Sequence, residues 1–310
     1  MDNSLLAVRD INHKYIVVER IFFMDKRIVD LHVHSTESDG TFTPEELVTE
    51  ALHAGLCAFA LTDHDTIGGI AAAKAAARET GLTVIPGIEL SCYNDDHEVH
   101  MVGLFIDETN AAFKESLKSV QDSREERNKK MIDRLREEAG FDISVEALRA
   151  YFPDAVLTRA HIARYLYEKG CIQDLNVAFQ KYIGDHCPYY VPREKMTPVQ
   201  AIDLIHAAGG LAILAHPLLY HLSDARLKQL MTDLKAHGLD GVEAIYSTYT
   251  AGEERQMKEL AAELDLAVSG GSDFHGANKP KIHLGTGKGS LFVPYAVFEH
   301  LKSLKEAHSN

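Results

Sequence analysis

Short apolar runs alternate with amphipathic stretches over two long parts of the chain, a pattern typical of strands separated by helices. The apolar runs predict buried strands at 28–34, 57–61, 83–86, 100–105, 211–215, 240–246 and 266–270. The amphipathic stretches predict helices at 44–55, 68–79, 198–208 and 223–237. Strands joined by helices of this length pair in parallel, so the sequence predicts an α/β protein with a doubly wound sheet or a barrel.

The alternation of strands and helices stops at Asp107. Beyond it the chain is charged, has no short apolar runs and contains long amphipathic stretches at 111–139 and 159–169, which predicts an inserted helical subdomain. The expected organisation is an N-terminal extension at 1–24, a first part of the α/β domain at 25–107, a helical insert at 108–195 and a second part at 196–310. The extension carries no motif, and Met24 is an alternative start.

Composition narrows the classes of partner. Lys and Arg number 32 against 46 Asp and Glu, for a formal charge of -14, which argues against wrapping long nucleic acid but allows a small anionic substrate in a locally positive pocket. The four cysteines show no C-x-x-C spacing, as expected of free thiols in a reducing compartment. No apolar stretch approaches the ~20 residues that span a bilayer, and no signal peptide is recognisable, so a cytoplasmic protein without membrane contact is expected.

Histidine is the one compositional outlier, with 17 residues. His32 and His34 end the first predicted strand, and because side chains alternate along a strand they point to the same side. Two imidazoles on one side of a strand end form half of a site for a divalent metal. Taken alone, the pair could equally be ordinary polar residues at a strand terminus, so the prediction depends on further ligands.

Those further ligands follow the other predicted strands. Because active sites of α/β proteins lie at the carboxyl ends of the strands, polar residues from six loops are expected to meet at one edge. They are Asp39, Asp63, His64, Asp65, Glu89, His100, His216, Asp273 and His275. Mixed imidazole and carboxylate ligands favour Zn²⁺, Mn²⁺ or Fe²⁺ over Ca²⁺ or Mg²⁺. The absence of thiols argues against a structural zinc site.

Five segments together resemble the motifs of the PHP phosphoesterases. They are D-L-H-V-H-S-x-x-S-D-G at 30–40, T-D-H-D at 62–65, P-G-I-E at 86–89, A-H-P at 215–217 and G-S-D-F-H-G at 271–276. The chain is most similar to the branch of single-domain nucleotide phosphoesterases with a helical insert, which includes 3′,5′-nucleoside bisphosphate phosphatases and relatives that trim short RNA oligomers. The resemblance implies a distorted (β/α)7 barrel that holds three divalent metal ions.

The resemblance also implies which residues bind each metal ion, with Mn²⁺, Zn²⁺ and Fe²⁺ all compatible. The first ion would be held by His32, His34, Glu89 and Asp273; the second by the bridging Glu89, His100 and His216; and the third by Asp39, His64 and His275. Three divalent ions bring about +6 charge, of which Asp39, Glu89, Asp273 and one hydroxide offset about four, leaving positive charge for a phosphoryl group. A hydroxide bridging the first two ions, held by His32, His34, Glu89 and Asp273, is expected to attack phosphorus in line.

Substrate contacts are expected from the insert. Thr158 is a predicted N-cap, which puts Arg159 and His161 in the first turn of a helix, where the helix dipole and a guanidinium favour an anion. The resemblance associates this T-R-x-H element with substrate phosphate. The alternative is that Arg159 pairs with an acidic neighbour and His161 packs against the barrel. Lys181 is a weaker candidate for substrate binding.

Three functions remain open at this stage. The first is a phosphomonoesterase for a small nucleotide, such as a 3′,5′-bisphosphate, or for short RNA oligomers. The second uses the same site as a cyclic-phosphate dihydrolase or a sugar or histidinol phosphate phosphatase; Ile245–Tyr249 stands where many relatives have Tyr-His-Pro and bears on this choice. The third is a non-catalytic module of the kind found in DNA polymerases, against which the complete ligand set argues.

Overall fold

The computed structural model describes residues 6–9, 15–18, 27–94, 97–153, 155–192 and 196–308. Within the expected N-terminal extension these include only a two-stranded antiparallel hairpin, β1 (Leu6–Arg9) and β2 (Tyr15–Val18). The remainder of that extension, with the alternative start at Met24, lies outside the described residues.

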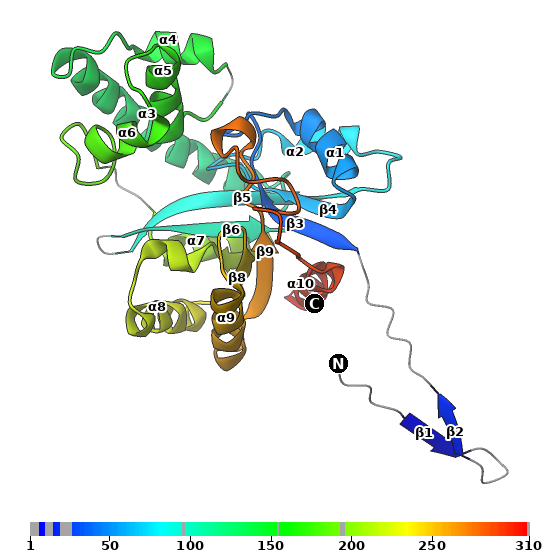
Figure 1. Cartoon of the computed structure of the whole chain (residues 1–310). Helices are drawn as coiled ribbons and strands as arrows, with labels where there is room; N and C mark the ends of the chain where they lie inside the picture. Colours follow the sequence, from blue (N-terminus) through cyan, green and yellow to red (C-terminus); the bar gives the residue numbers. More distant parts are fainter. Residues whose placement is uncertain are drawn as a thin grey trace.

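The central element is a seven-stranded mixed sheet that nearly closes into a barrel (Figure 1). Its strands, in spatial order, are β3 (Ile28–Val33), β4 (Leu56–Leu61), β5 (Thr83–Asn94), β6 (His97–Leu104), β7 (Leu211–Leu214), β8 (Gly241–Tyr246) and β9 (Ala267–Gly271). The two edge strands meet beyond β9, where the Asp273 backbone N–H donates to the His32 carbonyl at 2.9 Å and that of His34 donates to the Phe274 carbonyl at 3.0 Å. The predicted α/β barrel is confirmed.

The predicted parallel pairing is wrong for the middle of the sheet. The strand expected at 83–86 continues to Asn94, and β5 and β6 form an antiparallel hairpin whose ends pair Asn94 with His97. β6 also runs antiparallel to β7, whereas the other four pairs are parallel. The reason is that β5 ends at Asn94 and β6 begins at His97, which leaves no room for the crossover that a parallel pair needs. Because β6 is reversed, it also runs opposite to β7.

Helices cover the outside of the barrel in the order α1 (Pro44–His53), α2 (Ile70–Ala76), α7 (Pro198–Ala207), α8 (Asp224–Ala236) and α9 (Ala251–Glu263), and α10 (Tyr295–His308) follows the last strand. The sequence pattern did not single out α9 and α10. The start of α1 is set by a capping box in which the Thr43 hydroxyl accepts from the Glu46 backbone N–H and Glu46 accepts from that of Thr43, with Pro44 in the first turn. Its buried face follows the helical period with Leu47, Val48 and Ala51.

α10 lies at the end of the barrel opposite the histidine-rich strand ends. Phe298 and Leu301 pack on a buried cluster that includes Val29 and Leu31. The Val29 backbone N–H donates to the Val293 carbonyl just before α10, at the start of β3, whereas His32 and His34 stand at its end. One mouth of the barrel is therefore closed by apolar packing, and the other carries the polar residues.

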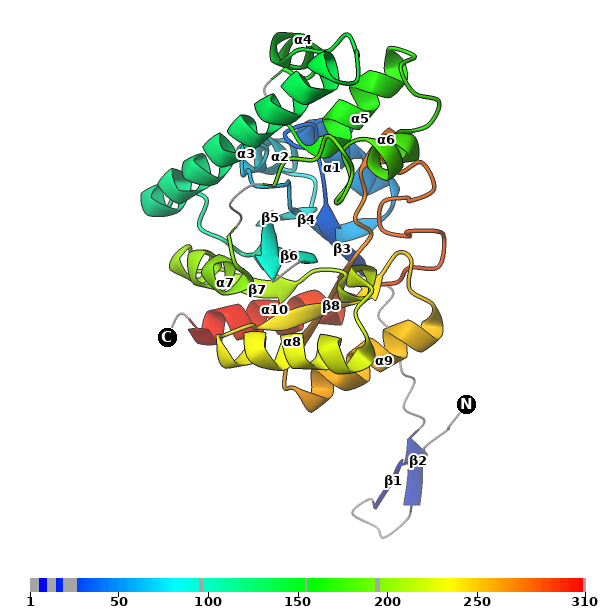
Figure 2. The same ribbon diagram turned by 90° about the vertical axis from the view of Figure 1, so that its left-hand side faces the viewer.

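The insert contains α3 (Ala111–Glu137), α4 (Val145–Tyr151), α5 (Arg159–Glu168) and α6 (Leu175–Lys181), which gather on one side of the barrel in Figures 1 and 2. Leu148, Ile162 and Ala178 belong to its own buried core. α3 belongs to both parts, because Phe113 near its start packs in the barrel core and Met131 near its end packs in the insert core. At 1.5 Å per residue, this helix is ~40 Å long. No helix among the described residues is long and apolar enough to cross a membrane.

Candidate metal centre

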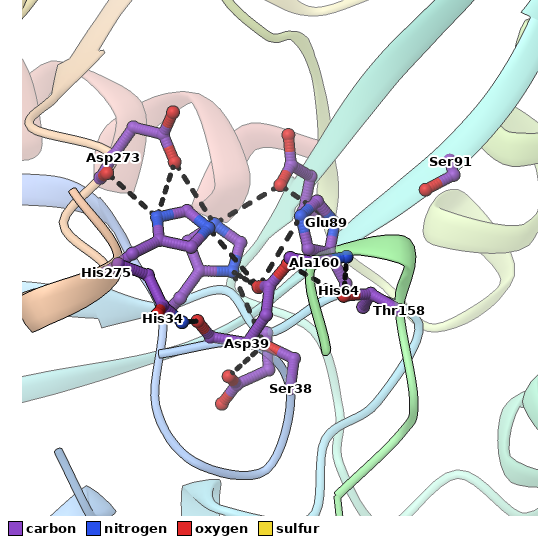
Figure 3. Close-up of polar contacts among 12 residues, drawn as sticks. His34, Ser38, Asp39, His64, Glu89, Ser91, Thr158, Ala160, Asp273 and His275 are labelled. Atoms are coloured by element: carbon purple, nitrogen blue, oxygen red, sulfur yellow. Dashed lines mark hydrogen bonds and ion pairs between the residues drawn. The ribbon is translucent and has the colours of Figure 1, made fainter. Parts of the chain in front are cut away.

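The predicted ligands come together at the open mouth of the barrel. Figure 3 shows six of them, which are His34, Asp39, His64, Glu89, Asp273 and His275. His32 and His34 lie at the end of β3, His64 follows β4, and Asp273 and His275 follow β9, as predicted. The sequence predicted that Glu89 would follow a strand, but in the structure it lies inside β5. Because His100 pairs opposite Ser91 in the hairpin, its side chain falls on the same face of the sheet as Glu89.

One group contains the two histidines of β3. Nε2 of His32 and Nε2 of His34 lie 3.3 and 3.2 Å from Oε2 of Glu89. The same two nitrogens lie 3.7 and 3.4 Å from Oδ1 of Asp273. These are the four residues expected at the first metal ion, and His32, His34 and Asp273 form one of the groups whose donor atoms are close enough to bind one ion.

Glu89 connects this group to a second one. Its Oε1 lies 2.8 Å from Nδ1 of His100 and 3.1 Å from Nε2 of His216, while its Oε2 faces the histidines of β3. The two oxygens of one carboxylate thus face two different sets of imidazoles. This is the arrangement of a carboxylate that bridges two cations.

The third group surrounds Asp39. Its Oδ1 lies 3.2 Å from Nε2 of His275 and 3.8 Å from Nε2 of His64. The other ring nitrogen of His64 lies 3.1 Å from Oε2 of Glu89, so His64 stands between two groups. The resemblance implies that His64 binds only the third ion, whereas in the structure His64 lies near both Asp39 and Glu89.

The donor atoms of this cluster fit metal ions. Buried polar atoms in folded proteins nearly always have a hydrogen-bond partner, yet several of the atoms facing the centre have none. Within the described residues these are Nε2 of His32, Nε2 of His34, Oδ1 of Asp39 and Nδ1 of His64. Cations between these atoms would satisfy all of them at once, with the imidazole and carboxylate ligands that transition metals accept.

Charge compensation leads to the same conclusion. Burial acts to raise the pKa of the carboxyls of Asp39 and Glu89, but neighbouring imidazoles hold both pKa values well below their usual range. Burial acts to lower the pKa of the imidazoles of His34 and His100, but the carboxylates around them raise it to about 9. The cluster therefore holds ionised carboxylates that need positive charge, from protons or from metal ions.

Residues behind the ligands hold them in place. Nδ1 of His32 lies 3.1 Å from the carboxylate of Glu243, which turns Nε2 toward the centre, and the other oxygen of Glu243 accepts from the His216 backbone N–H at 2.8 Å. At Gly271 a side chain would bring Cβ within 2.4 Å of Cβ of His32, so glycine allows the end of β9 to lie against β3. His216 and Asp273 have positive φ angles of 28° and 55°, which is strain of a kind common at functional sites.

Sequence reasoning did not find Glu243 or Lys279, and it singled out Tyr246 only as part of Ile245–Tyr249, a segment that bears on the substrate. Tyr246 donates to Oδ2 of Asp273 at 2.6 Å, and Nζ of Lys279 lies 2.5 Å from the same oxygen. Glu243 had a signal, because it is a single carboxylate inside the apolar strand Gly241–Tyr246. Lys279 lies in a loop where no pattern distinguishes it from a solvent-exposed lysine.

The acidic residues beside His64 have supporting roles. Asp63 accepts from the hydroxyls of Ser35 and Ser38 at 2.7 and 2.6 Å and so orders the loop that carries Asp39. Asp65 is fully buried and pairs with Arg124 of α3, whose Nε donates to it at 2.9 Å. This ion pair connects the loop of His64 with the base of the insert.

A cavity of ≈300 Å³ opens beside the cluster, between the barrel and the insert. Its wall includes Arg124 and Arg159 from the insert, and His100 and His216 from the proposed ligands. These ligands are called the metal-binding cluster below, and they are His32, His34, Asp39, His64, Glu89, His100, His216, Asp273 and His275. Nη2 of Arg159 donates to Glu98 at 2.7 Å. The predicted N-terminus of α5 is confirmed, and Arg159 is its first residue.

His161 and Lys181 do not line this cavity. The ring of His161 is buried, and its Nδ1 accepts from the Thr158 backbone N–H at 2.9 Å. Oγ1 of Thr158 donates to Asp39 at 3.1 Å, so His161 is connected to Asp39 through Thr158. Lys181 is exposed at the end of α6. Phe179 of the same helix lines the cavity, and because two residues are about 200° apart on a helix, Lys181 points away from it.

Comparison with known proteins places the chain in a family. The PHP domain model matches residues 30–185. A 5′-3′ exoribonuclease of Haemophilus influenzae is 41% identical over 246 residues, which cover 79% of this chain and 89% of that protein. A 3′,5′-nucleoside bisphosphate phosphatase of Chromobacterium violaceum is 36% identical over 80% of this chain and 87% of that protein. A solved structure of a candidate metal-dependent phosphoesterase from Bifidobacterium adolescentis has a TM-score of 0.78 and 31% identity, covering 89% of this chain and 96% of the other.

The chain belongs to the PHP domain family. Within it, the chain is a metal-dependent phosphoric ester hydrolase, as its named relatives and the ligand cluster together show. The alternative of a non-catalytic module is not supported.

Proposed function

We propose that this enzyme hydrolyses a phosphate ester of a small nucleotide, of the 3′,5′-nucleoside bisphosphate type, and also acts on the phosphorylated ends of short RNA oligomers. The observation that carries the proposal is that Arg159 lines the same cavity of ≈300 Å³ as four of the proposed metal ligands, which are Asp39, His64, His100 and His216. This volume lies at the low end for small-ligand sites, so a single nucleotide fits it better than a long polymer. One named relative is a 3′,5′-nucleoside bisphosphate phosphatase and the other is a 5′-3′ exoribonuclease, which supports both parts of the proposal.

Three divalent ions, of Mn²⁺, Zn²⁺ or Fe²⁺, are the proposed cofactors. His32, His34, Glu89 and Asp273 would hold the first, Glu89, His100 and His216 the second, and Asp39, His64 and His275 the third. When bound, the ions supply a water of lowered pKa and positive charge beside the phosphate oxygens. The residues behind the cluster keep its donor atoms directed inward, through Glu243 at His32 and through Tyr246 and Lys279 at Asp273.

Arg159 is the proposed partner of a second phosphate on the substrate. Its guanidinium is held on two sides, by Glu98 at 2.7 Å and Asp185 at 2.9 Å, so it faces the cavity in a fixed position before substrate binds. Glu98 also lies 3.6 Å from Nε2 of His100, which places the guanidinium one carboxylate away from the metal-binding cluster. A bisphosphate reaches both positions at once, whereas a monophosphate reaches one. His161 is proposed to position Thr158 and, through it, Asp39.

The test is a panel of phosphate esters assayed with metal-loaded enzyme, with inorganic phosphate measured for the phosphomonoesters and the products separated by chromatography for the cyclic phosphate and the RNA. The panel contains adenosine 3′,5′-bisphosphate, AMP, a ribose cyclic phosphate, ribose 5-phosphate and a 5′-phosphorylated RNA pentamer. The highest kcat/KM is expected for the bisphosphate, and the RNA should be shortened from its 5′ end. A cyclic or sugar phosphate turned over more efficiently than every nucleotide would overturn the proposed substrate class while leaving the reaction class intact.

A further inference from the structure

Two exposed apolar side chains stand in the cavity beside the metal-binding cluster. Six large hydrophobic side chains among the described residues are well exposed, namely Leu52, Tyr151, Tyr167, Phe179, Leu219 and Phe292. Phe179, 38% exposed, and Leu219, 42% exposed, both line this one cavity. A single exposed leucine needs no explanation, but two large apolar groups in one cavity, beside charged residues, indicate a binding surface.

The backbone that carries Phe179 is fixed by the turn that follows α6. A side chain at Gly184 would place its Cβ only 1.9 Å from the Phe179 carbonyl oxygen, so this position accepts only glycine. The thiol of Cys187 donates to the same oxygen at 3.3 Å, and the Ile183 backbone N–H donates to the Ala178 carbonyl at 2.9 Å. The aromatic ring is therefore presented to the cavity from a rigid support.

Leu219 comes from the barrel and is fixed by the same turn that aims His216 at Glu89. It lies in the 3-10 helix η1 (Pro217–Tyr220), where its backbone N–H donates to the His216 carbonyl at 2.9 Å. The next residue, Tyr220, donates its hydroxyl to the Ala215 carbonyl at 2.5 Å and accepts from the His100 backbone N–H at 3.1 Å. Leu219 thus keeps a constant position relative to two of the proposed metal ligands.

The chemistry of the two side chains restricts what they can bind. An aromatic ring and a branched aliphatic group favour a flat, uncharged group, and neither carries a donor or acceptor that could distinguish one base edge from another. Phosphate would occupy the other, charged part of the cavity, with Arg159 and the metal-binding cluster. On the basis of the proposed function, we propose that Phe179 and Leu219 form the nucleobase site and bind all four bases by stacking and van der Waals contact.

The first test compares substrates with and without a base. Phe179→Ala should lower kcat/KM for adenosine 3′,5′-bisphosphate roughly 5- to 160-fold, mainly through KM, because stacking of one base on an aromatic ring contributes about 1–3 kcal/mol. The abasic analogue, 1,2-dideoxyribose 3,5-bisphosphate, should be turned over equally by both proteins. Phe179→Trp should retain activity. With wild-type enzyme, the kcat/KM values for the four nucleoside bisphosphates should lie within roughly fivefold of one another. Phe292→Ala, which removes an exposed ring outside the cavity, is the matched control.

The second test measures binding without catalysis. The chain contains no tryptophan, so Phe179→Trp introduces a single indole as a fluorescent reporter at the proposed site. Titration of the metal-loaded variant with AMP should quench this fluorescence, because the base stacks on the indole, whereas ribose 5-phosphate should leave it unchanged. Phe292→Trp should respond to neither compound.

The outcomes separate this inference from the proposed function. If Phe179→Ala leaves kcat/KM for the bisphosphate unchanged, or lowers it equally for the abasic analogue, the nucleobase site is overturned and the proposed function stands. If wild-type enzyme hydrolyses no nucleotide, the proposed function fails and the fluorescence titration decides alone. Quenching by AMP but not by ribose 5-phosphate would then still support the nucleobase site, and no quenching would overturn it.

Discussion

The carboxylate of Glu243 lies 3.1 Å from Nδ1 of His32, while Nε2 of the same ring lies 3.3 Å from Glu89. A carboxylate accepts a hydrogen bond, so Glu243 makes Nδ1 the donor and directs Nε2 toward the cluster. Burial acts to lower the pKa of His32, but Glu243, Glu89 and Asp273 together raise it well above its usual value. Metal binding at this position therefore has to displace a proton.

Glu243→Gln should weaken metal binding roughly 10- to 100-fold, because the amide lacks the charge that raises the basicity of His32. Metal affinity is measured by competition with a chromophoric chelator. Glu263→Gln, on the exposed face of α9, is the matched control and should leave affinity unchanged. Equal affinities of Glu243→Gln and wild-type protein would contradict the role of Glu243.

Asp39→Asn should reduce the metal content from close to three ions per chain to close to two. Oδ1 of Asp39 is buried without a hydrogen-bond partner and faces His275 at 3.2 Å, so its loss removes the anionic ligand of the proposed third ion. Elemental analysis of protein purified without chelator measures the stoichiometry, with the fully exposed Asp265→Asn as control. Fewer than one ion in wild-type protein would argue against a trinuclear centre.

Arg159→Ala should lower kcat/KM for a nucleoside bisphosphate by roughly 10- to 100-fold, because a charge-assisted hydrogen bond contributes about 1.5–3 kcal/mol. For AMP, which lacks the second phosphate, the same substitution should lower kcat/KM much less. Steady-state kinetics with both substrates measure the difference, and Arg136→Ala on the exposed face of α3 serves as control. The same loss with both substrates would show that Arg159 does not bind the second phosphate.

Arg124→Leu should destabilise the fold by about 3–5 kcal/mol, because it leaves the carboxylate of Asp65 buried without its cation. The double variant that adds Asp65→Asn should recover part of this loss, since the uncompensated charge is then removed. Urea unfolding of the wild type, both single variants and the double variant gives the coupling free energy. Additive effects in this cycle would mean that the two side chains do not stabilise each other.

His206 should make stability depend on pH in the neutral range. The carboxylate of Asp240, 2.8 Å from Nε2, raises the pKa of His206 in the folded protein. The contribution is therefore fully present below the unfolded pKa of about 6.5 and is lost as the pH rises through the folded value. The difference in unfolding free energy between wild type and His206→Gln should fall as the pH rises above the unfolded pKa of about 6.5. A difference that stays constant or grows would refute this sign.

The barrel and the ligand types were predictable from the sequence because both follow local patterns. His32 and His34 stand two residues apart at a strand end, and Asp273 and His275 repeat this spacing. The hairpin β5–β6 was not predictable, since Pro86 and Gly87 suggested a strand end where the chain in fact stays extended. Glu89 was therefore predicted as a ligand but placed in a loop.

The supporting contacts were harder to predict, because they depend on distances between segments far apart in the sequence. Glu243 is 211 residues from His32, and Arg124 is 59 residues from Asp65. No periodicity links such positions. The cavity likewise forms only when the insert folds over the barrel, so a sequence pattern could name Arg159 as a stronger candidate than Lys181 but could not show which of them lines the cavity.

The long helix α3 has a consequence for the boundary at residue 108. Its first turns place Phe113 and Leu117 in the barrel core and Arg124 on Asp65, before the helix leaves for the insert. Deletion of residues 108–195 would therefore remove Phe113 and Leu117 from the barrel core and leave the buried carboxylate of Asp65 without its cation. The insert is a separate cluster of helices in space but not a detachable module, and the smallest protein that could keep the barrel intact would retain α3 at least as far as Arg124.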